Sequence, residues 1–313
     1  MAVLVTGAAG FLGSHVCDRL LEAKEEVVGL DSFDDFYARR IKEENLERAR
    51  GHSAFALVEA DIREADLLDR LPSSIDAVIH LAARAGVRRS INNPVLCADV
   101  NMMGTATLLD WIKRRGIGSF LFASSSAVYG DNTKVPFSEE DPVEHPLSPY
   151  AASKRSGELL CHTASHLGGI TVACLRLFTV HGPRQRPDLA IRKFAEILSR
   201  GGEVPLFGDG SSSRDYTFVD DAVMGLMGAL SWARRGKGRC EVFNLGNDHP
   251  VALSEMVETL AEVMGVEART RFLPAQPGDA VRSWADITKA KEILGYRPAT
   301  SFRVGITRFL EWL

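Results

Sequence analysis

Short apolar runs recur along the chain, and they do not alternate with polar positions as half-exposed strands do. Near-continuous runs of this kind are typical of strands that are buried on both faces of a parallel sheet. They predict strands at residues 2–5, 27–30, 54–58, 77–80, 120–123, 171–177 and 242–245. Helical periodicity between them predicts helices at residues 10–23, 39–50, 95–115, 150–166 and 189–200. This alternating order predicts an α/β fold with a doubly wound parallel sheet.

The chain changes character at about residue 179, where Gly, Pro and Arg become frequent (HGPRQRP, FGDGSSSRD, PAQPGD). We therefore expect a larger domain over residues 1–178 and a smaller, loop-rich C-terminal lobe over residues 179–313. A further apolar run near residues 241–246 predicts a strand that returns to the first sheet, which would make the lobe discontinuous.

The composition narrows the class of protein. The 313 residues are 45% hydrophobic and carry a formal net charge of −4, so we expect no nucleic-acid partner. No apolar run is long enough to span a membrane, and we expect no signal peptide, hence a cytoplasmic location. The spacings of the scattered cysteines match no metal-binding motif, which predicts free thiols and no metal site. These cysteines are Cys17, Cys97, Cys161, Cys174 and Cys240.

The segment VLVTGAAGFLGSHV places Gly7, Gly10 and Gly13 between the first predicted strand and the first predicted helix. This spacing suits a tight turn, a close approach of the backbone to a pyrophosphate, and close packing of helix on strand. Asp31 ends the second strand, where a carboxylate can accept from both ribose hydroxyls and would repel a 2′-phosphate. We therefore expect a Rossmann-type domain that binds NAD. The alternative is that the glycines serve packing alone and Asp31 is a turn residue.

Residues that end the third and fourth predicted strands are further candidates for cofactor contact. Because the carboxyl ends of parallel strands face the cofactor crevice, their side chains or backbone can reach the dinucleotide. These residues are Asp61, Ile62, Leu81, Ala82 and Ala83.

The segment SPYAASKRSGE carries the candidate catalytic pair. Ser148 is a natural N-cap and Pro149 suits the first helical position, so Tyr150 and Lys154 lie one turn apart on one helix face. A nearby ammonium lowers the pKa of a tyrosine from its usual value of about 10. Tyr150 could then take a proton from a sugar hydroxyl while hydride leaves the same carbon. The alternative is that both residues are exposed on the surface without a catalytic role, since this spacing occurs by chance on many helices.

The chain resembles the extended short-chain dehydrogenase/reductases, and among them the nucleotide-sugar 4-epimerases. The resemblance covers TGAAGFLGSH, HLAARAGVRRSI, NMMGT, SSSAVYG, SPYAASKRSGE, FTVHGPRQRPD, FGDGSSSRDYTFVDD, FNLG and QPGDAVRSWAD. It implies a tightly held NAD that is reduced and reoxidised in each turnover, and homodimers formed by packed helices. It also implies catalysis by Tyr150, Lys154 and Ser125, with Ser125 bonding the substrate 4-hydroxyl, and adds Phe11, Leu12 and Asn101 to the cofactor contacts.

Two positions after Ser125 bear on the fate of the 4-keto intermediate. In 4,6-dehydratases of this family the segment resembles T-D-E-V-Y-G, and in UDP-glucuronate decarboxylases a Glu directly precedes V-Y-G. Here Ser126 and Ala127 occupy these positions, and neither can act as a carboxylic acid. The resemblance therefore implies epimerisation without elimination or decarboxylation.

The segment GPRQRPD resembles UDP-glucuronate 4-epimerases. A uronic acid carries a C6 carboxylate, which arginine can bind with two parallel hydrogen bonds. We assign this role to Arg186, helped by Thr179. The alternatives are that Arg186 binds a phosphate or pairs with Asp188. The rival functions are a 4-epimerase of neutral UDP-hexoses such as UDP-glucose or UDP-N-acetylglucosamine, a UDP-glucuronate decarboxylase, and a non-catalytic dinucleotide sensor.

The remaining substrate contacts should hold the UDP part of the substrate while the keto-sugar rotates between the two hydride transfers. We expect Arg214 and Arg282 at the diphosphate, Phe207 on the uracil and Asp279 at its ribose. The other expected substrate contacts are Arg88, Ser124 and Ser126. Three residues depart from the family pattern and leave substrate preference open: Arg89, Cys97 and His181.

Overall fold

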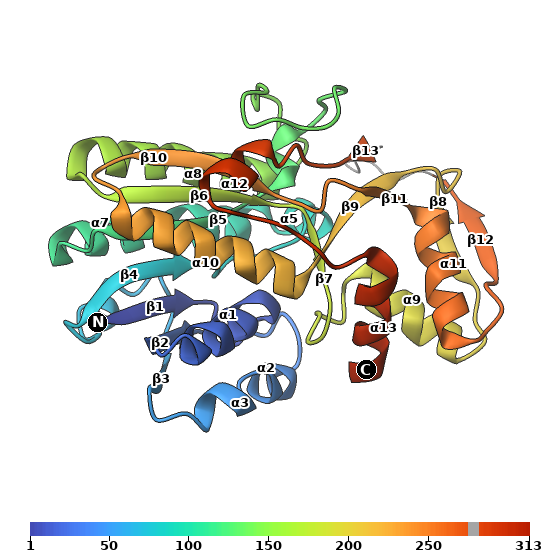
Figure 1. Ribbon diagram of the computed structural model, residues 1–313, viewed down its shortest axis with the longest axis horizontal. Helices are drawn as coiled ribbons and strands as arrows, with labels where there is room; N and C mark the ends of the chain where they lie inside the picture. The colour runs from blue at the N-terminus through green and yellow to red at the C-terminus, as the bar shows by residue number, and fades with distance from the viewer. Residues whose placement is uncertain (275–281) are drawn as a thin grey trace.

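Figure 1 shows the computed structural model of the protein, which describes residues 1–274 and 282–313. Within these residues the main sheet has seven parallel strands in the order β10-β6-β5-β4-β1-β2-β3. The strands are β1 (Ala2–Thr6), β2 (Glu26–Asp31), β3 (Phe55–Glu59), β4 (Ile75–His80), β5 (Ser119–Ser125), β6 (Thr171–Leu177) and β10 (Cys240–Leu245). The chain order reverses between β1 and β4, as in Rossmann-type sheets, so the predicted α/β fold class is confirmed.

Helices flank this sheet and build much of the C-terminal part (Figure 1). They are α1 (Phe11–Glu22), α2 (Arg39–Asn45), α3 (Glu47–Arg50), α4 (Ala65–Leu68), α5 (Val87–Asn92), α6 (Pro94–Ala98), α7 (Gly104–Arg115), α8 (Pro149–Gly168), α9 (Ala190–Ser199), α10 (Val219–Arg235), α11 (Leu253–Met264), α12 (Thr288–Ile293) and α13 (Phe302–Trp312). A π-helical turn, η1 (Asp99–Met103), joins α6 to α7, and a 3-10 turn, η2 (Ser126–Tyr129), follows β5.

The apolar runs of the strands are explained by burial on both faces of the main sheet. Val3 and Val5 belong to the core beneath α1 and α10, whereas Leu4 between them belongs to the core beneath α7 and α8. Successive side chains of a strand point to opposite faces, so a sheet covered on both sides needs apolar residues at nearly every position. The absence of alternation in the sequence thus reflects the two helical layers.

The C-terminal part carries smaller sheets and a core of its own. Its strands are β7 (Thr179–His181), β8 (Val204–Phe207), β9 (Ser213–Phe218), β11 (Pro250–Ala252), β12 (Thr270–Leu273) and β13 (Arg282–Ser283). Strand β9 pairs with β7, β11 and β13, and β8 pairs with β12. Residues of α9, α11 and α13, such as Phe194, Leu260 and Phe309, form a third apolar cluster. Helix α10 and strand β10 belong instead to the main sheet's layers, and the lobe boundary at residue 179 stays a prediction.

Two predicted helices are interrupted. The expected helix at residues 95–115 contains the π-helical turn η1, where the Asn101 side chain is drawn inward to bond the backbone of Arg84 and the Ser153 hydroxyl. The expected helix at residues 39–50 is divided at Leu46, which is fully buried beneath α1. Both interruptions follow from contacts with distant segments, which helical periodicity does not record.

Among residues 1–274 and 282–313, no helix is both long enough and apolar enough to cross a bilayer.

Candidate active site

The main crevice opens where β1 and β4 lie side by side, at the point where the strand order reverses. The glycines of the first loop allow this approach. A Cβ on Gly13 would lie 2.0 Å from the Gly7 carbonyl oxygen, and one on Gly7, whose φ is +71°, would lie 2.8 Å from the Ala82 nitrogen. Larger residues are therefore excluded at both positions. The N-terminus of α1 faces a cradle that fits a dinucleotide pyrophosphate.

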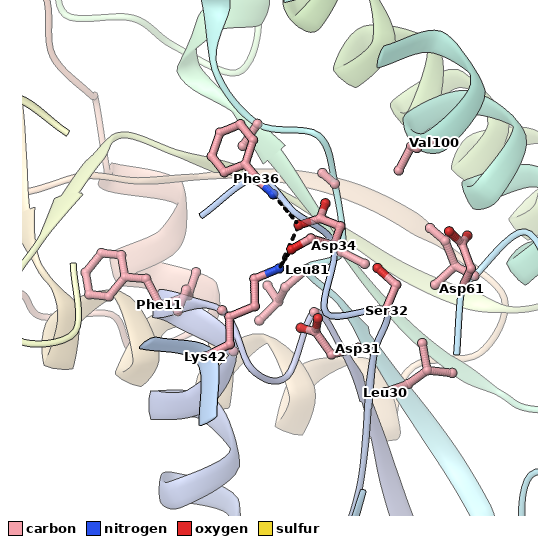
Figure 2. Close-up of a pocket in the computed structure, with 18 of the residues that line it drawn as sticks. Phe11, Leu30, Asp31, Ser32, Asp34, Phe36, Lys42, Asp61, Leu81 and Val100 are labelled. Carbon is pink, nitrogen blue, oxygen red and sulfur yellow. Dashed lines mark hydrogen bonds and ion pairs between the residues drawn. The ribbon is translucent and has the colours of Figure 1, made fainter. Parts of the chain in front are cut away.

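Asp31 stands at the carboxyl end of β2, in the floor of the crevice (Figure 2). Its Oδ2 accepts from the Ala9 nitrogen at 3.0 Å, and its Oδ1 accepts from the Phe33 nitrogen at 2.9 Å. Burial raises the pKa of Asp31, while these two bonds and the charge of Lys42 oppose the rise. A carboxylate oxygen can accept more than one hydrogen bond, so capacity for ribose hydroxyls is left. This arrangement fits the adenosine end of NAD.

Most of the predicted cofactor residues line this one crevice: Gly7, Gly10, Phe11, Leu12, Gly13, Asp31, Asp61, Ile62, Leu81, Ala82 and Ala83. Asn101 is not among the lining residues, because its amide is engaged with Arg84 and Ser153 behind the wall. Sequence reasoning missed Asp34, Phe36, Tyr37 and Lys42, which also line the crevice. Their position could have been expected from the sequence, because they belong to the run SFDDFYARRIK, which directly follows the strand that Asp31 ends.

The strand ends beside the crevice are joined by a buried histidine. His80 Nδ1 lies 2.7 Å from Thr6 Oγ1, and its Nε2 lies 3.0 Å from Thr105 Oγ1. Because Thr105 donates its hydroxyl proton to the Asn101 carbonyl, His80 must donate from Nε2 and accept from Thr6 at Nδ1. Burial lowers the pKa of His80 to about 3, so the ring is neutral near pH 7. It therefore ties β1, β4 and the first turn of α7 together without adding charge.

Tyr150, Lys154 and Ser125 meet at the start of α8. As predicted, Ser148 caps this helix: its hydroxyl accepts from the Ala151 nitrogen at 3.1 Å. The Ser125 hydroxyl lies near the Tyr150 phenol and, by hydrogen bonding, opposes the rise in the pKa of that phenol. Lys154 Nζ donates to the Ala123 carbonyl at 2.7 Å and lies 5.9 Å from the centre of the Tyr150 ring. The structure thus brings the three predicted catalytic side chains into one group.

Protonation in this group is set by burial and by an unexpected cation. Burial raises the pKa of Tyr150, and the bond with Ser125 and the positive charge of Arg186 act against it. Burial lowers the pKa of Lys154 to about 8, so its ammonium is largely retained at pH 7. Among the protein's side chains, sequence reasoning assigned the pKa-lowering charge to Lys154 and did not identify Arg186. Arg186 therefore lies close enough to influence the phenol electrostatically.

The three consecutive serines have different surroundings. Ser125 faces Tyr150, but Ser124 is buried and donates to Glu158 Oε1 at 2.6 Å. Glu158 also forms a two-bond ion pair with Arg176, at 2.9 and 3.0 Å. Ser126 begins the 3-10 turn η2 and is partly exposed. Alternation along β5 turns Ser124 away from its neighbour, so its substrate contact remains a prediction that the geometry does not favour.

Arg186 lines the crevice, and its Nε and Nη2 atoms donate to Asp188 at 2.9 and 3.0 Å. The pairing with Asp188, weighed as an alternative from the sequence, is therefore present. A guanidinium has a second edge, formed by Nη1 and Nη2, that can bind another carboxylate. Arg184, two residues earlier in the same loop, pairs with Asp18 of α1 at 2.8 Å. Thr179 begins β7 and is half-buried.

The remaining predicted substrate residues form two neighbouring pairs. Arg88 of α5 lies 5.1 Å from the centre of the Phe207 ring, at the end of β8. Arg214 and Arg282 lie on adjacent strands, since Arg282 of β13 is in register with Ser213 of β9. Within the described residues Arg214 makes no ion pair with the nearby acidic residues Asp215 and Asp220. Asp279 lies outside the described residues.

Two of the residues that differ from the family pattern, His181 and Cys97, contribute to packing. His181 is fully buried among Tyr216, Phe218 and Phe302, and burial lowers its pKa to about 4. Cys97 is buried beside Asn101, 3.4 Å from its amide nitrogen. Neither side chain lines the crevice between β1 and β4. His181 packs in the core of the C-terminal part, and Cys97 supports the wall behind Tyr150.

Comparisons with known proteins agree with this geometry. The family model for the NAD dependent epimerase/dehydratase family matches residues 3–246. A UDP-glucuronate 4-epimerase from Thermodesulfobacterium geofontis is 38% identical over 312 residues, which cover 99% of this chain and 95% of that protein.

Two solved structures have the same overall fold. A UDP-glucuronic acid 4-epimerase from Bacillus cereus, in complex with UDP-glucuronic acid and NAD, superposes with a TM-score of 0.93 at 36% identity, covering 100% of this chain and 98% of that one. A UDP-glucose 4-epimerase from Thermotoga maritima, with UDP-glucose, has a TM-score of 0.89 at 35% identity, with the same coverage.

Proposed function

Because the chain belongs to the NAD dependent epimerase/dehydratase family, we propose that it is a 4-epimerase that interconverts UDP-glucuronate and UDP-galacturonate. The observation that carries the proposal is the position of Arg186. Its guanidinium lines the dinucleotide crevice and lies within electrostatic reach of Tyr150, the base proposed for the 4-hydroxyl. A uronate carries its carboxylate on C5, the carbon next to C4. A cation close to Tyr150 is therefore suited to that carboxylate.

In the proposed mechanism, Tyr150 takes the proton of the 4-hydroxyl and Ser125 holds the same oxygen by a hydrogen bond. NAD, held by the glycine turn and Asp31, would supply the hydride acceptor for C4 and, once reduced, the hydride donor for the 4-keto intermediate. Arg186 favours the tyrosinate by its positive charge, and Lys154, one helical turn from Tyr150, is proposed to act in the same direction. Tyr150 gives its proton back to the epimeric alkoxide, so the residues end the cycle unchanged.

The intermediate between the two transfers is a 4-keto uronate, a β-keto acid prone to decarboxylation. Ser126 and Ala127 offer no carboxyl group beside it to act as an acid. The Nη1/Nη2 edge of Arg186 holds the carboxylate near the plane of the ketone, where loss of carbon dioxide is disfavoured. The sugar must also turn about its diphosphate link. Arg214 and Arg282 on neighbouring strands, with Phe207 beside Arg88, are proposed to hold the UDP meanwhile.

The test compares purified protein with the variants Arg186→Gln and Arg184→Gln. UDP-glucuronate, UDP-glucose and UDP-N-acetylglucosamine are offered separately, and the products are resolved by NMR. The wild type and the Arg184 control should convert UDP-glucuronate to UDP-galacturonate. In Arg186→Gln this activity should fall about 10- to 100-fold, which corresponds to the free energy of a hydrogen bond to a charged group. Undiminished turnover of UDP-glucuronate by Arg186→Gln would overturn the carboxylate assignment, and carbon dioxide as main product would overturn epimerisation.

Epimerisation of neutral UDP-hexoses is the second candidate. The ion pair between Arg186 and Asp188 favours it, because a carboxylate of the protein already balances the guanidinium charge. A sugar without a carboxylate would then leave no unpaired cation in the site. The same assay separates the candidates: preferential turnover of UDP-glucose or UDP-N-acetylglucosamine by the wild type would establish the second one.

We also propose a homodimer and a cytoplasmic location. Large apolar side chains are exposed along the adjoining elements α6, η1 and α8, namely Val95, Leu96, Met103 and Leu159. Such a patch across packed helices suits burial against a second copy. All five cysteines are free, which suits a reducing compartment.

A further inference from the structure

Residues 32–37, which we call the strap, follow β2 and line the rim of the crevice with Ser32, Asp34, Phe36 and Tyr37. Figure 2 shows Asp34 bonded to both Lys42 and Phe36: its Oδ1 accepts from Lys42 Nζ at 2.6 Å and from the Phe36 nitrogen at 3.3 Å. Arg84, from the segment after β4, lies 3.4 Å from Asp34 and 3.5 Å from Asp35. The strap is thus tied to elements on two sides of the crevice.

Phe36 contacts two guanidinium groups from different parts of the chain. Arg89 of α5 has its guanidinium carbon 3.8 Å from the ring centre, and its Nη1 donates to the Phe36 carbonyl at 3.3 Å. The guanidinium carbon of Arg186 lies 5.0 Å from the same ring centre. Both distances lie within the range of cation–π attraction. One aromatic side chain therefore connects α5, the strap and the Arg186 loop.

Asp188 partly balances the positive charges of Arg186 and Arg89. Burial tends to raise the pKa of Asp188, but its bonds to Arg186 and the charges of Arg186 and Arg89 outweigh this effect and lower it. The carboxylate is therefore ionised near pH 7 and offsets part of the repulsion between the two arginines. Arg89, Phe36, Arg186 and Asp188 form a mutually supporting group, the Phe36 cluster.

We propose that Arg89 is a positioning residue that acts through Phe36, holding the strap closed over the crevice and slowing the release of bound NAD. Strap residues line the crevice, so they must move before a ligand beneath them can leave. Each contact that breaks in that motion lowers the population of the open state. Arg89 makes two such contacts with Phe36, one to the ring and one to the carbonyl.

The test measures release of NAD in the absence of any sugar nucleotide. Full-length protein is loaded with isotopically labelled NAD and chased with excess unlabelled NAD, and the bound label is followed over time. Arg89→Ala should release NAD about two- to fivefold faster than the wild type, the factor expected for loss of an exposed cation–π contact. Arg40→Ala is the matched control: Arg40 is an exposed arginine paired with Glu44 on α2, and its loss should leave release unchanged.

A double-mutant cycle tests whether Arg89 acts through the ring. Phe36→Leu should also accelerate release, Phe36→Tyr should behave as the wild type, and Arg89→Ala combined with Phe36→Leu should be no faster than the faster single variant. Release from folded Arg89→Ala at the wild-type rate, or fully multiplicative effects in the double variant, would overturn the proposal. Because no sugar is present, these outcomes are independent of whether UDP-glucuronate is the substrate.

Discussion

At Tyr150, burial and charge act in opposite directions on one phenol. Burial makes the phenol a weaker acid, while Ser125 and Arg186 favour its ionised form. Lys154 stands one helical turn away with its ammonium on the Ala123 carbonyl. The proposed base thus depends on groups from three segments of the chain, which explains why the Y-x-x-x-K spacing by itself is a weak indicator of catalysis.

Tyr150→Phe removes only the hydroxyl that is proposed to move the proton. Turnover should fall at least about 100-fold, the usual contribution of a general base, while the melting temperature and NAD binding stay close to the wild-type values. Steady-state assays and NAD titration would measure these effects. The control is Tyr129→Phe, because the Tyr129 hydroxyl bonds Asn244 away from the crevice. It should cost about 1 kcal/mol of stability and spare turnover; a Tyr150→Phe enzyme of normal rate would rule out the assigned base.

His80 should make the stability of the protein sensitive to acid. Its pKa in the folded state is about 3, below the value of about 6.5 in the unfolded chain. Between these values the unfolded chain binds a proton that the folded protein does not, so stability falls as pH is lowered through this window. The free energy of unfolding, measured with denaturant from pH 6.5 to 4.5, should fall less steeply with decreasing pH in His80→Asn than in the wild type, by up to about 1.4 kcal/mol per pH unit. Equal slopes would show that His80 is not buried in its neutral form.

At the scale of elements, the junction of β1 and α1 depends on the missing side chain of Gly13. A Cβ there would overlap the Gly7 carbonyl at 2.0 Å, so α1 would have to move away from the strand. The helix N-terminus and the pyrophosphate cradle would move with it.

We expect Gly13→Ala to weaken NAD binding by more than tenfold and to lower the melting temperature. Calorimetric titration with NAD and thermal unfolding would measure the two effects. Gly118→Ala is the matched control, because a Cβ at Gly118 meets nothing within 4 Å and its φ is not positive. If both variants bound NAD equally well, close packing at Gly13 would not be needed for the site.

Element boundaries also show what local patterns cannot predict. Ser148 and Pro149 start α8 as predicted, because capping is decided by neighbouring residues. The π-helical turn at Asn101 was not predicted, since it depends on Arg84 and Ser153, which are distant in the chain. The orientation of Ser124 could not be predicted either, because its hydrogen-bond partner Glu158 lies on another element.

At the scale of the whole molecule, the exposed apolar row on α6, η1 and α8 is proposed to be the dimer interface. Leu159 is 53% exposed on α8, and Leu159→Asp should convert a dimer to monomers, as measured by light scattering after gel filtration. Met224→Asp is the control, since Met224 is similarly exposed, at 52%, on α10, which packs on the other face of the main sheet. A wild-type protein that is monomeric at micromolar concentration would contradict the proposed dimer.

The amino-acid sequence alone was enough to predict the parallel sheet, the glycine turn with Asp31, the capped helix that carries Tyr150 and Lys154, and the resemblance to nucleotide-sugar epimerases. These features depend on residues that are close together in the chain, namely apolar runs, short spacings and cap residues. Three-dimensional packing was needed to show that Arg186 shares its guanidinium with Asp188 and approaches Tyr150, and that Arg89 contacts Phe36. Those contacts join segments far apart in the chain, and their partners are set by how the strands, helices and loops pack around the crevice.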